Sequence, residues 1–283
     1  MSYKILTKKV LNPQIFLMEI EAPLVARRAE PGQFIILRID EFGERVPFTI
    51  ADFDREKGTV TIIVQAVGKT TKELSKFESG DLILDFAGPL GRPTELEGYK
   101  KVAVIGGGLG TAIAYPQAKK LHAMGTDVTV ITGFRDKDLI ILEDELKAVS
   151  NKLIITTDDG SNGLKGFVTD RLKEEIEAGE KFDAVIAIGP LMMMRAVCNL
   201  TKEYNIPTIV SMNPVMIDGT GMCGGCRVIV DGEVKFACVD GPDFDGHKID
   251  WQSALNRGRM FKEFEQKSCE EGKCRIGRDN HHA

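Results

Sequence analysis

Residues 218–238 carry three cysteines in a glycine-rich segment, so the fold must bring three thiols together if they share one site. Cys223 and Cys226 are separated by two glycines, which let the backbone approach a ligand and point amide groups at sulfur. Cys238 follows residues 227–237, which predict a two-stranded hairpin with an Asp-Gly turn. The pattern predicts a bound metal ion or iron–sulfur cluster rather than an ordinary loop.

Three thiols leave one position of a four-ligand site open. Asp218 lies five residues before Cys223, and the spacing Asp-x4-Cys-x2-Cys, with Cys238 beyond, matches that of plant-type ferredoxins with aspartate in place of the first cysteine. Zinc is the alternative, because the three cysteines and His247 also form a Cys3His set. Buried cysteines without a metal are a third interpretation. We favour an iron–sulfur cluster held by Asp218, Cys223, Cys226 and Cys238.

The whole chain has the composition of an ordinary globular protein. Its 283 residues suffice for two domains with their own cores. The net charge of -5 and the scattered basic residues argue against nucleic acid as a partner. No run of about 18 apolar residues occurs and the first residues do not resemble a signal peptide, so we expect no membrane contact and a cytoplasmic location. Clustered cysteines in that compartment bind metal more often than they form disulfides.

Residues 1–98 predict a small antiparallel β-barrel domain. Short apolar or alternating runs are separated by turn residues, which is typical of such barrels. One helix, Thr70–Phe77, interrupts the strands. The predicted strands are Ile15–Glu21, Gln33–Asp40, Arg45–Ala51, Gly58–Val67 and Asp81–Ala87.

Two segments of this barrel carry side chains suited to a dinucleotide. The Arg45 guanidinium can bind a pyrophosphate through two hydrogen bonds, and the Thr49 hydroxyl can bind a ring nitrogen. Further on, a strand ends at Gly68 and a helix opens with Thr70 and Thr71, where the helix N-terminus favours an anion. A surface arginine and a simple helix cap are the plainer interpretations. Together, the two segments predict a dinucleotide stretched across the barrel.

From residue 99 to residue 212 strands alternate with helices, which predicts a parallel nucleotide-binding sheet. An apolar strand, Lys101–Ile105, leads through a glycine loop into a helix that ends near Met124. Phosphate groups approach helix N-termini through such loops, although this one is not a strict G-x-G-x-x-G and a tight turn is the alternative. The residues assigned to nucleotide binding are Gly106, Gly107, Gly108, Gly110 and Thr111.

The later strands of this sheet are predicted at 127–133, 153–157, 183–188 and 207–212, with helices at 143–149 and 169–178. The charged residues 135–138 lie where an adenosine ribose would bind, but their mixed charge does not distinguish NAD from NADP. Gly189 and Pro190 form a turn at the carboxyl end of a strand, where it can cover a nicotinamide. The methionines that follow are assigned to core packing.

Residues 213–250 are assigned to the cluster-binding loop, with 239–244 as an irregular turn. Residues 251–283 form a C-terminal helix, predicted at 251–265, and a polar tail. Cys269 and Cys274 lie in that tail, and we interpret them as unpaired surface cysteines.

Over residues 3–265 the chain resembles the ferredoxin–NADP reductase superfamily, because it carries five motifs in the order found there. More narrowly, the chain resembles two sister families: the electron-transfer subunit of dihydroorotate dehydrogenase and the small subunit of NADH-dependent reduced ferredoxin:NADP oxidoreductase, a sulfide dehydrogenase-like protein. The order of motifs is more specific than any one of them. The motifs are Arg45-x-Pro47-Phe48-Thr49, Gly68-Lys69-Thr70-Thr71, the loop Gly106–Gly110, Gly189-Pro190 and the three-cysteine segment.

The resemblance implies FAD in the barrel, NAD(H) on the α/β domain and a [2Fe–2S] cluster in the C-terminal segment. A hydride would pass between the nicotinamide and the flavin without an acid or base from the protein, with Thr49 nearest the reacting flavin nitrogen. The flavin contacts implied by the family motif are Arg45, Pro47, Phe48, Thr49, Ile63, Val64, Gln65, Thr70 and Thr71.

One residue distinguishes the two sister families. The orotate subunit has four cysteines around its cluster, whereas the small subunit of the transhydrogenase has one aspartate and three cysteines, as here with Asp218. The resemblance therefore implies a bifurcating enzyme in which a larger flavin and iron–sulfur subunit forms a heterodimer with this chain and binds ferredoxin and NADP(H). The alternatives are the orotate subunit, a stand-alone reductase and a zinc-bearing nucleotide sensor without redox activity.

Overall fold

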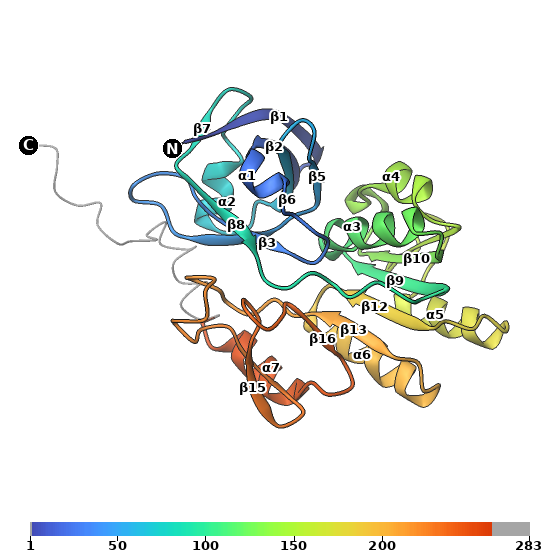
Figure 1. Cartoon of the computed structure of the whole chain (residues 1–283). Helices are drawn as coiled ribbons and strands as arrows, with labels where there is room; N and C mark the ends of the chain where they lie inside the picture. Colours follow the sequence, from blue (N-terminus) through green and yellow to red (C-terminus); the bar gives the residue numbers. More distant parts are fainter. Residues whose placement is uncertain (1, 262–283) are drawn as a thin grey trace, which may run out of the picture.

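The structure, a computed structural model, describes residues 2–261 and divides them into three regions that meet at one place (Figure 1). An antiparallel β region comes first, a parallel sheet flanked by helices follows, and a C-terminal segment lies below the first region and beside the second. None of the helices in residues 2–261 has the length and apolar character needed to span a membrane.

The N-terminal region consists of two antiparallel sheets around one apolar core. One sheet has the strand order β5-β6-β2-β1-β7 and the other has the order β4-β3-β8. Side chains from both sheets, such as Met18 and Ile62 on one and Ile35 on the other, form a single buried cluster. The elements are β1 Tyr3–Asn12, β2 Ile15–Glu21, α1 Pro23–Ala26, β3 Phe34–Arg38, β4 Val46–Thr49, β5 Asp52–Asp54, β6 Thr59–Gln65, α2 Lys69–Leu74, β7 Leu82–Ile83 and β8 Asp85–Leu90.

Several predicted elements of this region need correction. Strand β1 was not predicted, because only Ile5 and Asn12 of its ten residues are buried and the alternation of apolar and polar residues is weak. Arg45 precedes β4 rather than opening it, and β4 ends at Thr49, before the predicted limit at Ala51. Helix α2 is shorter than predicted and is capped by Gly68.

The second region is a sheet with strand order β11-β10-β9-β12-β13-β16, in which the first five strands are parallel. Alternate residues of β9 face opposite sides: Val102 and Val104 pack toward α3 and α4, and Ala103 and Ile105 pack toward α5 and α6. The elements are β9 Lys101–Gly107, α3 Gly110–Ala123, β10 Asp127–Phe134, η1 Lys137–Leu139, α4 Glu143–Ala148, β11 Lys152–Thr157, α5 Val168–Glu177, β12 Ala184–Ile188, α6 Leu191–Glu203 and β13 Thr208–Ser211.

The C-terminal segment leaves this sheet and returns to it. After β13 the chain forms the hairpin of β14 (Arg227–Val230) and β15 (Glu233–Phe236), and then pairs with β13 again through β16 (Asp243–Asp245). The prediction of an irregular turn at 239–244 was therefore wrong at its end, because Asp243 and Phe244 belong to a strand whose three residues are too few to show a pattern. Helix α7, Trp251–Arg259, ends before the predicted limit at residue 265, and Cys269 and Cys274 lie outside the described residues.

Candidate functional site

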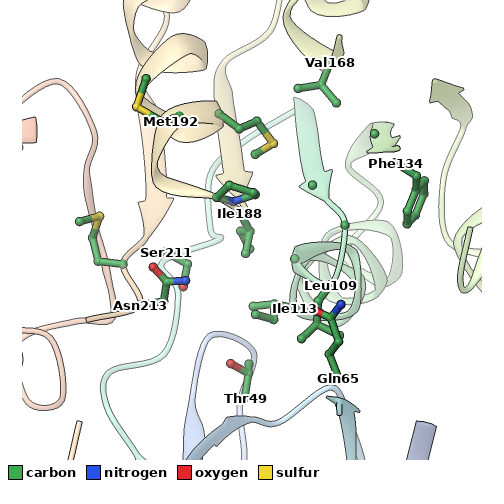
Figure 2. Close-up of a pocket in the computed structure, with 18 of the residues that line it drawn as sticks. Thr49, Gln65, Leu109, Ile113, Phe134, Val168, Ile188, Met192, Ser211 and Asn213 are labelled. Carbon is green, nitrogen blue, oxygen red and sulfur yellow. The ribbon is translucent and has the colours of Figure 1, made fainter. Parts of the chain in front are cut away.

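A cavity of about 1060 Å³ lies where the three regions meet. Figure 2 shows Gln65 close to Leu109 and Ile113, Ser211 and Asn213 toward the left of the view, and Thr49 below them. The volume is at the upper end of the range of small-molecule sites, so the cavity has room for a large, extended ligand. The predicted site residues that line it are Pro47, Thr49, Gln65, Gly107, Gly108, Gly110, Gly189 and Pro190.

On the barrel side, Thr49 is the last residue of β4 and pairs with Phe34 of β3. Its hydroxyl lies at the cavity (Figure 2) and forms no hydrogen bond with any residue in the described part of the chain. Gln65, the last residue of β6, also faces the cavity, with its amide 3.4 Å from the side-chain oxygen of Gln14. A free hydroxyl and an amide at the ends of two strands suit the polar edge of a flavin ring.

The glycine loop between β9 and α3 approaches the cavity from the opposite side. Gly108 has a φ of +54°, and a Cβ added there would meet no atom within 4 Å, so its backbone faces open space. Gly107 and Gly110 differ, because a Cβ would overlap the Met193 sulfur at the first and the Ile188 carbonyl oxygen at the second. An open backbone at the N-terminus of the 14-residue helix α3 fits the phosphates of a nucleotide.

Other predicted nucleotide residues support the loop from behind. A Cβ at Gly106 would collide with the backbone of Thr111, and Thr111 is fully buried with a hydroxyl that has no hydrogen-bond partner among the described residues. A Cβ at Gly189 would come within 2.8 Å of the Met193 side chain. Met194 is buried as predicted, whereas Met192 is 58% exposed and lines the cavity.

The remaining predicted flavin residues do not line the cavity. The Thr70 hydroxyl donates to Glu44 (2.8 Å), and the Thr71 hydroxyl accepts the Gly68 amide (2.9 Å). Arg45 Nε donates to the carbonyl of Ile217 (3.3 Å), immediately before Asp218. Phe48 packs against the barrel core, and Ile63 and Val64 are buried in β6. Contacts of these residues with a flavin stay predictions.

The cysteine segment brings part of the predicted ligand set together. The sulfurs of Cys226 and Cys238 are 3.2 Å apart. The Gly225 amide points at the Cys223 sulfur (3.4 Å) and the Cys238 amide at the Cys226 sulfur (3.4 Å). Backbone amides directed at sulfurs stabilise an anionic cluster, so the donor set fits an iron–sulfur group. In residues 2–261 no three His, Cys, Asp or Glu side chains are arranged closely enough to hold a metal ion, so the full four-ligand set stays a prediction.

Asp218 shapes this loop through its carboxylate. One oxygen accepts the Thr220 amide (2.9 Å) and the other accepts the Cys223 amide (2.7 Å). These hydrogen bonds, led by that from Thr220, lower the pKa of Asp218, so the carboxylate is ionised at neutral pH and ready to bind a cation. Burial, together with the Cys226 thiol, raises the pKa of Cys238 to about 12, and a bound metal would favour its thiolate. His247 instead lies 3.0 Å from the Thr201 hydroxyl.

Comparison with known proteins places the chain in a family. Residues 104–199 match the profile of the oxidoreductase NAD-binding domain, and residues 213–250 match that of the iron–sulfur cluster binding domain of dihydroorotate dehydrogenase B. The dihydroorotate dehydrogenase B electron transfer subunit homolog of Thermotoga maritima is 46% identical over 94% of this chain and 94% of its own length. The chain belongs to the family of dihydroorotate dehydrogenase B electron-transfer subunits and their homologues.

Three further proteins are similar to this chain. An uncharacterized protein in the adh 3' region of Clostridium beijerinckii is 53% identical over 97% of this chain and 93% of its own length. A solved structure described as giving insights into flavin-based electron bifurcation via the NADH-dependent reduced ferredoxin-NADP oxidoreductase is 45% identical, with a TM-score of 0.89 over 95% of this chain and 97% of its own. A ferredoxin NADP+ reductase from Neisseria gonorrhoeae, 20% identical with a TM-score of 0.61 over 72% of this chain and 90% of its own, shares the fold.

These matches confirm the predicted resemblance and the predicted fold class. They also confirm that the chain is an electron-transfer subunit of an oxidoreductase. They also confirm its cofactor set of FAD, NAD(H) and a [2Fe–2S] cluster, and so disfavour the zinc alternative. Membership of a family of electron-transfer subunits implies a larger partner subunit in a heteromer.

Some cavity residues were not predicted from the sequence. Ser211 ends β13, Asn213 follows it, and Phe134 ends β10, so all three lie at the edge where parallel sheets bind ligands. Phe167 and Val168 reach the cavity from the start of α5, for which the sequence offers no comparable signal.

Proposed function

We propose that the chain is the electron-transfer flavoprotein subunit of a bifurcating NADH-dependent reduced ferredoxin–NADP oxidoreductase. The observation that supports this most is that one cavity is lined by Thr49 of the barrel, by Gly108 of the nucleotide loop and by Asn213, which leads into the cysteine segment. A nicotinamide and a flavin that share such a cavity lie within reach of each other and of the cluster loop.

In this function each region has one task. The open backbone at Gly108 binds the NAD(H) pyrophosphate, and the Gly189-Pro190 turn covers the nicotinamide. Thr49 hydrogen-bonds the flavin ring at its reacting edge, while Arg45 and the α2 start bind its pyrophosphate. A bound flavin would supply the exchange between two-electron transfer with the nicotinamide and one-electron transfer with the cluster, and the protein would orient the two rings without acid or base catalysis.

Asp218 is the proposed fourth ligand of the cluster, with Cys223, Cys226 and Cys238. The carboxylate is ionised, and its hydrogen bond to the Cys223 amide joins it directly to the first cysteine of the pair. A carboxylate is a harder ligand than a thiolate, so one iron should differ electronically from the other. Asp218→Cys should therefore keep the iron but change the EPR spectrum and the potential of the cluster. An unchanged spectrum and potential would place the fourth ligand elsewhere.

The larger partner subunit is proposed to dock on the face around the cysteine segment. Apolar side chains of this segment are exposed, led by Met222, which is 89% exposed and next to Cys223. An exposed apolar patch beside the electron exit is where a partner would bury surface and shorten the transfer distance. The other exposed apolar side chains of this segment are Val215, Ile217, Val234 and Val239.

The orotate electron-transfer subunit is the second candidate, because the matched iron–sulfur profile and the relative from Thermotoga maritima both carry that name. Purification of the chain from cytoplasmic extract at native expression level, with the subunit that accompanies it, distinguishes the two. We expect the complex to reduce NAD+ and ferredoxin together at the expense of NADPH. Orotate formation from dihydroorotate, without activity toward ferredoxin and NADPH, would refute the proposal.

A further inference from the structure

Two arginines bind consecutive carbonyls of the loop between the paired cysteines. Arg227 Nε donates to the Gly224 carbonyl at 3.0 Å, and Arg257 Nη2 donates to the Gly225 carbonyl at 2.8 Å. Arg227 opens strand β14, directly after Cys226, whereas Arg257 comes from helix α7. Two separate elements therefore direct positive charge at the same short loop.

The orientation of the loop peptides follows from these contacts. The carbonyl of the peptide that joins Gly224 to Gly225 accepts from Arg227, while the amide of the same peptide points at the Cys223 sulfur at 3.4 Å. Because carbonyl and amide lie on opposite sides of a planar peptide, holding the carbonyl fixes the amide toward the sulfur. Arg227 thus orients the positive end of a peptide dipole toward a cluster ligand.

The helix that carries Arg257 is fixed at its N-terminus by two hydrogen bonds. Asp250 caps α7 by accepting the Ser253 amide at 2.9 Å, and Trp251 Nε1 donates to the Gly246 carbonyl at 3.1 Å. The Arg257 Nε is buried and has no hydrogen-bond partner among the described residues. Within residues 2–261 neither Arg227 nor Arg257 forms a salt bridge, so no neighbouring carboxylate neutralises either charge.

We propose that Arg227 and Arg257 are positioning residues that hold the loop carbonyls away from the sulfurs and raise the reduction potential of the cluster. This inference rests on the proposed function, in which the loop holds a [2Fe–2S] cluster. One-electron reduction adds a negative charge to a group that is already anionic, so nearby positive charges and amides directed at sulfur stabilise the reduced form. Arg45 at Ile217 and Arg92 at Val239 bind two further carbonyls of the same segment.

The test is an EPR-monitored redox titration of the complex of this chain with its partner subunit. Arg257→Gln should lower the equilibrium constant for one-electron reduction by about tenfold, a potential about 59 mV more negative, with the iron content unchanged. Arg227→Gln should shift the potential in the same direction. Arg259→Gln is the matched control. Arg259 lies on the same helix, is exposed and has no hydrogen bond or salt bridge in the described part of the chain. The cluster potential of this variant should therefore equal that of the parent.

Each outcome supports or overturns the inference. If Arg257→Gln loses its iron, Arg257→Lys is the deciding variant. Because lysine keeps the positive charge, we expect it to keep the iron and a cluster potential close to that of the parent. Loss of iron from the lysine variant would show that Arg257 acts only through packing. Glutamine variants with full iron and the parent potential would refute the role of the arginines alone. A parent complex without iron would refute the proposed function itself.

Discussion

The nucleotide loop and the cysteine loop are both rich in glycine, yet they are shaped by different forces. In the nucleotide loop, Gly107 and Gly110 allow β9, α3 and the turn after β12 to touch, and a Cβ at either position would overlap a neighbour. In the cysteine loop, residues 223–226, a Cβ at Gly224 would meet only Phe236, at 3.7 Å, and polar side chains such as Asp218 and Arg257 hold the chain. One loop is formed by packing and the other by hydrogen bonds to its backbone.

The difference shows what each loop requires. A loop shaped by packing keeps its form without its ligand, which suits a nucleotide that binds and leaves at every turnover. A loop whose amides point at thiols would be completed by the proposed cluster, and Cys226 and Cys238 would both be buried around it. Mutations in one loop should therefore change the binding of its own ligand and leave the other loop intact.

The largest effect is expected from Cys226→Ala. Its sulfur is 3.2 Å from that of Cys238, and removal of one of four ligands should abolish cluster binding completely while the nucleotide loop stays intact. Iron content and visible absorbance measure the loss, and NADH binding measures the intact loop. Cys198→Ala is the control, because Cys198 is buried in α6 and should leave the iron content unchanged. Loss of NADH binding in Cys226→Ala would show that the loops are not independent.

Arg45→Ala probes the boundary between the regions, since Arg45 is predicted to bind FAD and also contacts Ile217 of the cysteine segment. Loss of a charge-assisted contact should weaken FAD binding by about 1.5–3 kcal/mol, or roughly ten- to hundredfold in affinity, without loss of iron. Flavin affinity by fluorescence titration gives the answer. Full flavin affinity together with a depleted cluster would assign Arg45 to the cysteine segment instead.

The packing account of the nucleotide loop is tested by a pair of glycines. In Gly110→Ala the new Cβ overlaps the Ile188 carbonyl oxygen, so the free energy of unfolding should fall by about 1–3 kcal/mol. In Gly108→Ala the new Cβ enters open space, so only the left-handed backbone conformation is unfavourable. The free energy of unfolding should therefore fall by about 1 kcal/mol. Denaturant unfolding followed by circular dichroism compares them. Equal losses would contradict a loop formed by packing.

The last effect depends on pH and concerns Asp243, where the C-terminal segment meets the other regions. Its carboxylate accepts from Thr94 (2.5 Å) and Gln117 (3.2 Å), and burial raises its pKa to about 6. A raised pKa in the folded state means that stability is full below about pH 4 and falls as pH rises to about 6, by at most about 1.4 kcal/mol per pH unit. Unfolding between pH 4 and 7 should show this slope in the parent and not in Asp243→Asn, and equal slopes would exclude Asp243 as its source.

The sequence predicted what depends on local pattern. The β9 strand, its glycine loop and the three-cysteine segment all carry their signal within about twenty residues, and all are in the structure. Strand β1, which is mostly exposed, and β16, which is too short, have no such signal. The contacts that complete the site also depend on the fold, because nothing local shows that Arg257 would reach Gly225.

The central claim is that electrons pass between a nicotinamide and an iron–sulfur cluster within this one chain. Anaerobic titration of the purified chain with NADH, followed by visible absorbance and EPR, tests it most directly. We expect NADH to bleach the flavin absorbance and to produce the EPR signal of a reduced [2Fe–2S] cluster, and Gly108→Val, which obstructs the open backbone of the nucleotide loop, should require more NADH for the same signal. A colourless protein, or a cluster that NADH leaves oxidised, would contradict the account.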